Sequence, residues 1–225
     1  MKSSVCLVGW PGAGKTRLVQ SLKDSALAEW QESAGLVWAV EPHQQAWVVI
    51  DARSPIEDQD ELARLLHAGD ALVLMFWEAV GLDDQAWWLK QLKHSVPNKP
   101  YATCLYQTLS ASVIEKLLQA PPSAQNPNWP ALARLEFSLP KVVLEHLLFV
   151  LDSAKQNMGL DIWRVQAVLD TQEYINPVAI EGTRLRWDSF AATSDELGQL
   201  RIEGRNLDAS QIQDWLQACF VAGHR

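Results

Sequence analysis

The segment that decides the fold is Val5-Cys6-Leu7-Val8-Gly9-Trp10-Pro11-Gly12-Ala13-Gly14-Lys15-Thr16. Its last eight residues match the spacing G-x-x-x-x-G-K-[ST]; they follow an apolar run and precede an amphipathic stretch. Glycines let the backbone curl around an anion, so that successive N–H groups and a helix N-terminus point at it. The match predicts a strand, a phosphate-binding loop and a helix; the alternative is a glycine-rich turn that binds nothing.

The same spacing assigns a role to each residue of the loop. Lys15 is expected to reach the β- and γ-phosphates of a nucleotide, and the Thr16 hydroxyl to ligate Mg²⁺. The backbone contacts to the nucleotide are expected from Gly9, Gly12, Ala13 and Gly14. The loop therefore predicts a bound nucleotide with Mg²⁺ as cofactor.

Apolar runs alternate with amphipathic stretches on the C-terminal side of this loop. Strands are expected at 4–9, 36–40, 46–51, 71–77 and 101–106. Helices are expected at 15–30, 60–67, 83–93 and 110–119. The polar segment 41–45 suits a hairpin or a turn at a sheet edge. This β-α-β alternation predicts an α/β fold of the P-loop type, with a doubly wound, mostly parallel sheet.

The composition changes at 120–130, where four of the chain's eleven prolines fall within eleven residues. Because proline removes a backbone donor and restricts its predecessor, this segment is interpreted as a linker. Beyond it, strands are expected at 134–138, 161–169, 173–180, 183–187 and 199–203, and helices at 140–156, with Pro140 in the first turn, and at 209–220. We therefore expect a nucleotide-binding domain at 1–120, a linker at 121–130 and a small α+β domain at 131–225.

Composition narrows the choice of partners and of compartment. Nineteen Lys and Arg residues stand against 27 Asp and Glu residues, a net charge of −8, and no long basic tract interrupts the chain. A nucleic-acid partner is therefore not expected. No apolar run reaches the roughly 18 residues of a membrane span, so no membrane association is expected either. The cysteines Cys6, Cys104 and Cys219 are distant and odd in number, which indicates reduced thiols in a cytoplasmic protein.

A loop of this type is commonly accompanied by a second acidic residue near Mg²⁺, at the end of a neighbouring strand. Asp51 closes the apolar run 46–51 and is the predicted metal ligand; the alternative is a turn residue that ends a strand. Glu78 is a weaker candidate. Arg53 could stabilise charge on the phosphates, or it could simply be solvated.

Gly9 to Thr16 resembles the Gly-Phe-Leu-Gly-Ala-Gly-Lys-Thr loop of CobW-type P-loop GTPases. Residues 200–208, Leu-Arg-Ile-Glu-Gly-Arg-Asn-Leu-Asp, are similar to the segment that ends the CobW C-terminal domain, and 162–169 resembles a strand of that domain. The resemblance implies GTP as the nucleotide, with ATP not excluded, and slow Mg²⁺-dependent hydrolysis.

Several family motifs are absent from their expected places. The 35 residues between Lys15 and Asp51 contain no cysteine, so the family's metal-binding Cys-x-Cys-Cys is missing and no zinc site is predicted. No Asn-Glu pair is visible after the loop's helix, and Asp51-Ala52-Arg53-Ser54 keeps the acid of Glu-x-x-Gly without its glycine. The guanine-reading Asn-Lys-x-Asp would fall on 106–109, where no position matches. We interpret Asn98-Lys99 as a coincidence because it precedes the strand at 101–106.

Three hypotheses follow. The first is a nucleotide-binding protein that hydrolyses GTP slowly. The second is a non-hydrolysing nucleotide-binding or interaction module whose protein partner is unknown. The third, a small-molecule kinase, is disfavoured because the sequence shows no arginine-rich lid.

Overall fold

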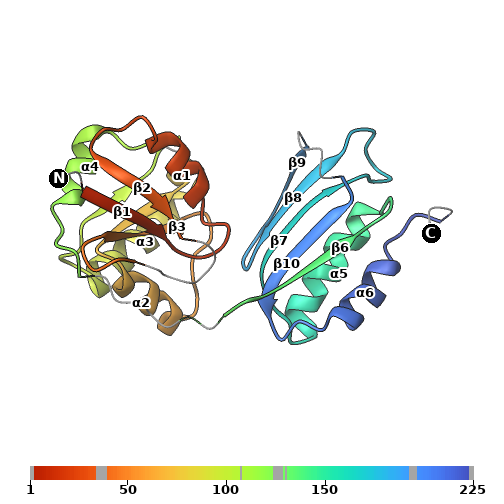
Figure 1. The fold of residues 1–225 in the computed structure, drawn as a ribbon. Helices are drawn as coiled ribbons and strands as arrows, with labels where there is room; N and C mark the ends of the chain where they lie inside the picture. The colour runs from red at the N-terminus through yellow and green to blue at the C-terminus, as the bar shows by residue number, and fades with distance from the viewer. Residues whose placement is uncertain are drawn as a thin grey trace. The chain divides into compact units, whose positions relative to one another are not determined.

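The computed structural model describes residues 3–33, 40–106, 108–123, 129, 131–192 and 197–222. The chain divides into two compact units, Met1–Pro130 and Ala131–Arg225 (Figure 1). The division falls at the end of the proline-rich segment. Each unit has its own sheet and its own hydrophobic core, and each is therefore described by itself.

The described residues of the first unit form a five-stranded sheet in the order β2-β1-β3-β4-β5. All of its pairings are parallel. Its strands are β1 (Ser3–Val8), β2 (Ala28–Glu32), β3 (Gln45–Asp51), β4 (Ala71–Met75) and β5 (Tyr101–Thr103). Its helices are α1 (Lys15–Leu22), α2 (Gln59–Ala68), η1 (Trp77–Ala79, a 3₁₀ turn), α3 (Leu82–Ser95) and α4 (Ala111–Leu118). The predicted parallel α/β sheet is confirmed.

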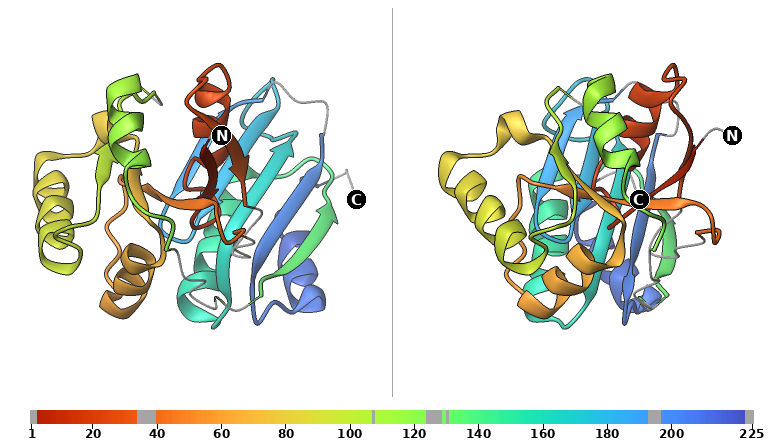
Figure 2. Two further views of the ribbon diagram at one scale, coloured as in Figure 1. Left: turned by 60° about the vertical axis from the view of Figure 1, so that its left-hand side comes forward. Right: turned by 90° about the vertical axis from the view of Figure 1, so that its left-hand side faces the viewer.

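Helices cover both faces of this sheet, as the alternation of side chains along β1 requires (Figure 2). Val5 and Leu7 pack in the cluster that contains residues of α1 and α4. Cys6 and Val8 pack in the cluster that contains residues of α2 and α3. The sheet is therefore buried on both sides, which explains the continuous apolar run of β4.

Several elements of the first unit end earlier than expected. The helix after the loop ends at Leu22, where Ser25 N donates to Leu22 O at 2.9 Å, and β2 begins at Ala28. Of the two alternatives for 41–45, the hairpin is wrong because β3 pairs in parallel with β1, and the turn is found, with Gln44 N donating to Glu41 O at 3.0 Å. β4 ends at Met75 because Phe76 has a φ of 59°, which turns the chain out of the strand. Of the expected strand at 36–40, residues 36–39 lie outside the described residues.

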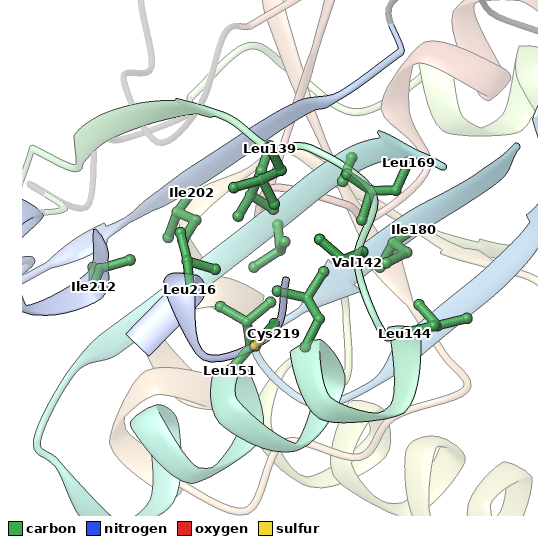
Figure 3. Packing of buried hydrophobic residues seen from close by; sticks show 14 of the residues in the cluster. Leu139, Val142, Leu144, Leu151, Leu169, Ile180, Ile202, Ile212, Leu216 and Cys219 are labelled. Atoms are coloured by element: carbon green, nitrogen blue, oxygen red, sulfur yellow. The ribbon is translucent and has the colours of Figure 1, made fainter. Parts of the chain in front are cut away.

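The second unit carries an antiparallel sheet in the order β6-β10-β7-β8-β9, with α5 and α6 on one face (Figure 1). Its elements are β6 (Ala133–Ser138), α5 (Leu144–Asn157), β7 (Asp161–Leu169), β8 (Val178–Thr183), β9 (Trp187–Ala191), β10 (Gln199–Arg205) and α6 (Ala209–Gln217). The core lies between the sheet and these helices (Figure 3). The predicted α+β arrangement is confirmed.

Three elements of this unit begin later than expected. The strands expected at 173–180 and 183–187 are β8 and β9, each shifted toward the C-terminus. Pro140 does not lie in a first helical turn, since Val142 pairs in extended form with Thr171 and Phe220. α5 can therefore begin only at Leu144, after this pairing ends.

Candidate functional site

The loop between β1 and α1 is a tight curl that excludes side chains at two of its glycines. Gly9 has a φ of 140°, and a Cβ there would lie 2.3 Å from the carbonyl oxygen of Val49 in β3. Gly14 has a φ of 93°, and its Cβ would lie 3.1 Å from the ring of Phe76. Both values of φ disfavour any residue with a Cβ. The first and last turns of the loop thus require the glycines that the sequence pattern supplies.

Lys15 is the first residue of α1 and is only 5% exposed. Its ammonium donates to the carbonyl oxygens of Gly9 at 3.0 Å and Trp10 at 3.1 Å, which places the charge within the curl. The N-terminus of a helix carries a partial positive charge of its own. Cation, helix end and loop backbone therefore make this a favourable place for an anion.

Thr16 follows directly, and its hydroxyl donates to the carboxylate of Glu32 at 2.9 Å. Glu32 is the last residue of β2 and lies opposite Leu7 of β1. The sequence did not indicate Glu32, because the expected helix at 15–30 covered the start of β2 and left no strand there; Asp24-Ser25, where the turn occurs, was the available signal. A hydroxyl and a carboxylate are hard oxygen donors of the kind that Mg²⁺ prefers.

Asp51 ends β3, the strand on the other side of β1. Its carboxylate accepts hydrogen bonds from Arg53 N at 3.0 Å, Arg53 Nε at 2.9 Å and Arg53 Nη2 at 2.6 Å. Asp51 is two residues beyond Val49, whose side chain packs on the α1 side of the sheet, so the two share a face. The role of Asp51 as a metal ligand stays a prediction, and its partner in this structure is Arg53.

Phe76 connects these groups. It is 6% exposed and follows β4 in a left-handed conformation, with φ 59° and ψ 31°. The guanidinium carbon of Arg53 lies 3.9 Å from its ring centroid, and that of Arg17 lies 5.6 Å away. With Gly14 against the same ring, Phe76 brings Arg53 to the loop.

A tryptophan from the end of the first unit also contacts the loop. The rings of Trp10 and Trp129 meet edge to face, with centroids 6.2 Å apart. The guanidinium carbon of Arg64 in α2 lies 5.1 Å from the Trp129 ring. Trp129 of the proline-rich segment therefore contacts the phosphate loop at Trp10.

The weaker candidates have structural partners. Glu78 accepts a hydrogen bond from Tyr106 N at 3.2 Å, and Thr108 N donates to Leu105 O at 3.0 Å. The second of these bonds closes a tight turn after β5, at the place expected for the guanine-reading motif; Gln107 lies outside the described residues. The Lys99 ammonium donates to carbonyl oxygens at the end of α2.

The three cysteines are buried. Burial, and secondarily Glu78, raises the pKa of Cys104 to about 12, and burial raises the pKa of Cys219 to about 11. These thiols are therefore protonated at neutral pH. Within the described ranges, no three His, Cys, Asp or Glu side chains converge as a metal site would require. None of the helices described is both long and apolar enough to cross a membrane.

The parallel sheet, the glycine-rich loop and the buried lysine are those of a P-loop fold. No family model matches the chain, and no curated protein sequence is significantly similar to it. Among solved structures, the Zn(II)-bound YjiA GTPase from E. coli is similar with 9% identity and a TM-score of 0.39, over 98% of this chain and 99% of that one. Translation elongation factor SelB from Methanococcus maripaludis, in complex with the GTP analogue GppNHp, is similar with 12% identity and a TM-score of 0.39, over 94% and 54% of the two chains.

Proposed function

We propose that the first unit binds a nucleoside triphosphate with Mg²⁺ at residues 9–16, with GTP preferred, and hydrolyses it slowly. The observation that carries this proposal is the position of Lys15, whose ammonium is 5% exposed and is held by two carbonyls of the curled loop. An ammonium so placed, at a helix N-terminus, costs desolvation that an anionic ligand would offset. Gly9, Gly12, Ala13 and Gly14 would surround the phosphates with backbone N–H groups.

Mg²⁺ fits the oxygen donors beside the loop. Thr16 would hold it, with Asp51 as the predicted carboxylate and Glu32 as a second one, already bonded to the Thr16 hydroxyl. When bound, Mg²⁺ neutralises charge on the phosphate oxygens. The protein's part is to hold the carboxylates of Glu32 and Asp51 at the carboxyl ends of β2 and β3, on either side of the loop.

The preference for GTP rests on the resemblance to CobW-type proteins in the loop and in 200–208. The sequence at 106–109 lacks the aspartate that would accept hydrogen bonds from guanine, so the preference over ATP is expected to be weak.

A nucleotide-binding module without hydrolysis is the second candidate. The observation that favours it is the three hydrogen bonds between Asp51 and Arg53, which occupy the carboxylate that the main proposal assigns to Mg²⁺. Phosphate release from GTP, measured over hours with Lys15→Ala as the blank, separates the two candidates.

Calorimetric titration with GTP, ATP and GDP in the presence of Mg²⁺ tests the main proposal. Lys15→Ala should weaken triphosphate binding by roughly 10- to 100-fold, since it removes charge-assisted hydrogen bonds. Lys23→Ala is the matched control, because Lys23 is exposed at the far end of the same helix. If the wild type binds no nucleotide, or if Lys15→Ala binds as tightly as Lys23→Ala, the proposal is wrong.

A further inference from the structure

Arg53 lies beside the phosphate loop in space, although in the sequence it is 37 residues beyond Thr16, the last residue of that loop. Its guanidinium carbon is 3.9 Å from the Phe76 ring centroid, and the edge of that ring meets the Cβ position of Gly14 at 3.1 Å. One aromatic ring therefore separates the guanidinium from the turn that precedes Lys15. Arg53 belongs to the surroundings of the loop.

The guanidinium is held in a defined orientation. Two of its nitrogens donate to the two oxygens of Asp51, at 2.9 and 2.6 Å, and its side chain is 18% exposed. A planar fork that matches a carboxylate in this way also matches phosphate oxygens. The residue is thus preorganised for an anion of this geometry.

Phe76, whose ring lies against Arg53, has an unfavourable backbone conformation. Phe76 has a φ of 59°, in the left-handed region that bulky residues rarely adopt, and it is 6% exposed. Such conformations persist where the surrounding structure imposes them, and they cluster at functional sites. The result is that the Phe76 ring contacts both Arg53 and the loop.

We propose that Arg53 recognises the terminal phosphate of a bound nucleoside triphosphate, exchanging the Asp51 carboxylate for phosphate oxygens while it stays against Phe76. This inference rests on the nucleotide-binding function proposed above and names the residue that distinguishes a triphosphate from a diphosphate. Asp51 is then a positioning residue for Arg53. The exchange removes both guanidinium bonds from Asp51 and leaves the bond from Arg53 N to Oδ1, so that Oδ2 becomes accessible to a cation, as the predicted metal role of this carboxylate requires.

Arg17 is the other arginine near the same ring, and it is less suited to this role. Its guanidinium carbon is 5.6 Å from the Phe76 centroid, and the residue is exposed in the first turn of α1. An exposed charge is screened by solvent and salt more than a half-buried one. Arg17 therefore provides a matched control that removes one arginine from the same neighbourhood.

The experiment measures the affinities of the full chain for GppNHp and GDP with Mg²⁺, or for the adenine analogues if the wild type binds those. Three variants are compared: Arg53→Met, Arg53→Lys and Arg17→Met. We expect Arg53→Met to lose about 10- to 100-fold of the preference for triphosphate over diphosphate, with diphosphate affinity changed less than about twofold. Arg17→Met should keep the preference. Arg53→Lys, which retains the charge without the fork, should lose part of it, and it supplies the test if Arg53→Met does not fold.

The outcomes separate this inference from the function on which it rests. If the wild type binds no nucleotide, the proposed function fails and Arg53 recognises no phosphate. If the wild type binds nucleotides but shows no triphosphate preference, or if both Arg53 variants keep it, Arg53 only fixes the turn after β3 and the inference is overturned. An equal loss in Arg17→Met would also overturn it, because the effect would then be general charge.

Discussion

Lys15, which is buried, and Lys99, which is half-buried, lie at opposite ends of the parallel strands and show what makes a lysine part of a binding site. The carboxyl edge and the amino edge of the sheet are the ends at which its strands finish and begin. Lys15 lies at the carboxyl edge, where its ammonium bonds two carbonyls of a curled loop at the N-terminus of α1. Lys99 lies at the amino edge, where its ammonium bonds Leu66 O at 2.7 Å, His67 O at 3.0 Å and also Gly69 O. These carbonyls belong to the C-terminal end of α2, which carries partial negative charge. The same side chain adds to a positive helix end in one place and neutralises a negative one in the other.

The amino ends of the strands also border a cavity of about 810 Å³, lined by Asp70, Lys99 and Ser123 among others. These three residues bond the protein itself. Asp70 accepts from Ala46 N at 2.8 Å and from Ser123 N at 2.6 Å. Volume alone therefore does not indicate the site; the direction of the nearby helix and the glycines that leave room for an anion do.

The largest effect that would test this contrast is expected at Gly9. Gly9→Ala places a methyl group 2.3 Å from Val49 O at a φ of 140°, so the loop must shift away from β3. We expect it to destabilise the first unit by about 2 to 5 kcal/mol and to abolish nucleotide binding. Denaturant unfolding combined with hydrogen exchange of β1 and β3 measures the change.

Gly81→Ala is the control, since a Cβ there meets nothing within 4 Å. It should cost less than about 1 kcal/mol. A loss for Gly9→Ala no larger than that of Gly81→Ala would mean that the loop does not lie against β3 as described.

The next largest effect concerns Lys99. Lys99→Met removes the bonds to the last carbonyls of α2 and should destabilise the first unit by about 1 to 3 kcal/mol, while nucleotide affinity is unchanged. Lys93→Met, at an exposed lysine of α3, is the control. Parallel unfolding and titration experiments on both variants separate stability from binding; a loss of nucleotide affinity in Lys99→Met would erase the contrast with Lys15.

The same variant has a signature in pH. Burial lowers the pKa of Lys99 to about 8, while Asp70 acts in the opposite direction. Between pH 8 and the unfolded value of roughly 10.4, the unfolded chain holds a proton that the folded chain has lost. This group therefore makes the free energy of unfolding rise with pH in that window. The destabilisation by Lys99→Met should grow from pH 8 to pH 10, and a decrease would show that the carbonyls hold the ammonium charged.

The sequence predicted most of the first unit because its strongest signals are local. The run before Gly9, the glycine spacing and the apolar run of β4 each describe a strand or a turn within a few residues. Glu32 was missed since β2 has only one buried residue of five, so neither a strand nor a helix pattern dominates there. An edge strand pairs on one side only, and its backbone partners are invisible in a local pattern.

The environment of the predicted site residues was the other part that the sequence could not supply. Asp51 and Arg53 are both candidates in the sequence at the end of β3, but their bidentate pairing depends on a turn stabilised by Arg53 N. In the sequence, Phe76 continues an apolar run and so predicts a longer strand. Its left-handed conformation and its contacts with Gly14 and Arg53 are visible only in the structure. Contacts between residues 14, 53 and 76 are tertiary, and periodicity carries no information about them.

The smallest effect is expected at the edge-to-face pair of Trp10 and Trp129, 6.2 Å apart. This ring contact concerns the carboxyl edge alone, because it joins the end of the first unit to the phosphate loop. A double-mutant cycle with Trp10→Leu and Trp129→Leu should give a coupling of about 0.5 to 1.5 kcal/mol in the free energy of unfolding. Trp10→Leu with Trp30→Leu is the control, since Trp30 packs on the opposite face of the sheet, and these two changes should be additive. Additive behaviour in the first pair as well would show that the tryptophan of the proline-rich segment adds nothing to the stability of the loop.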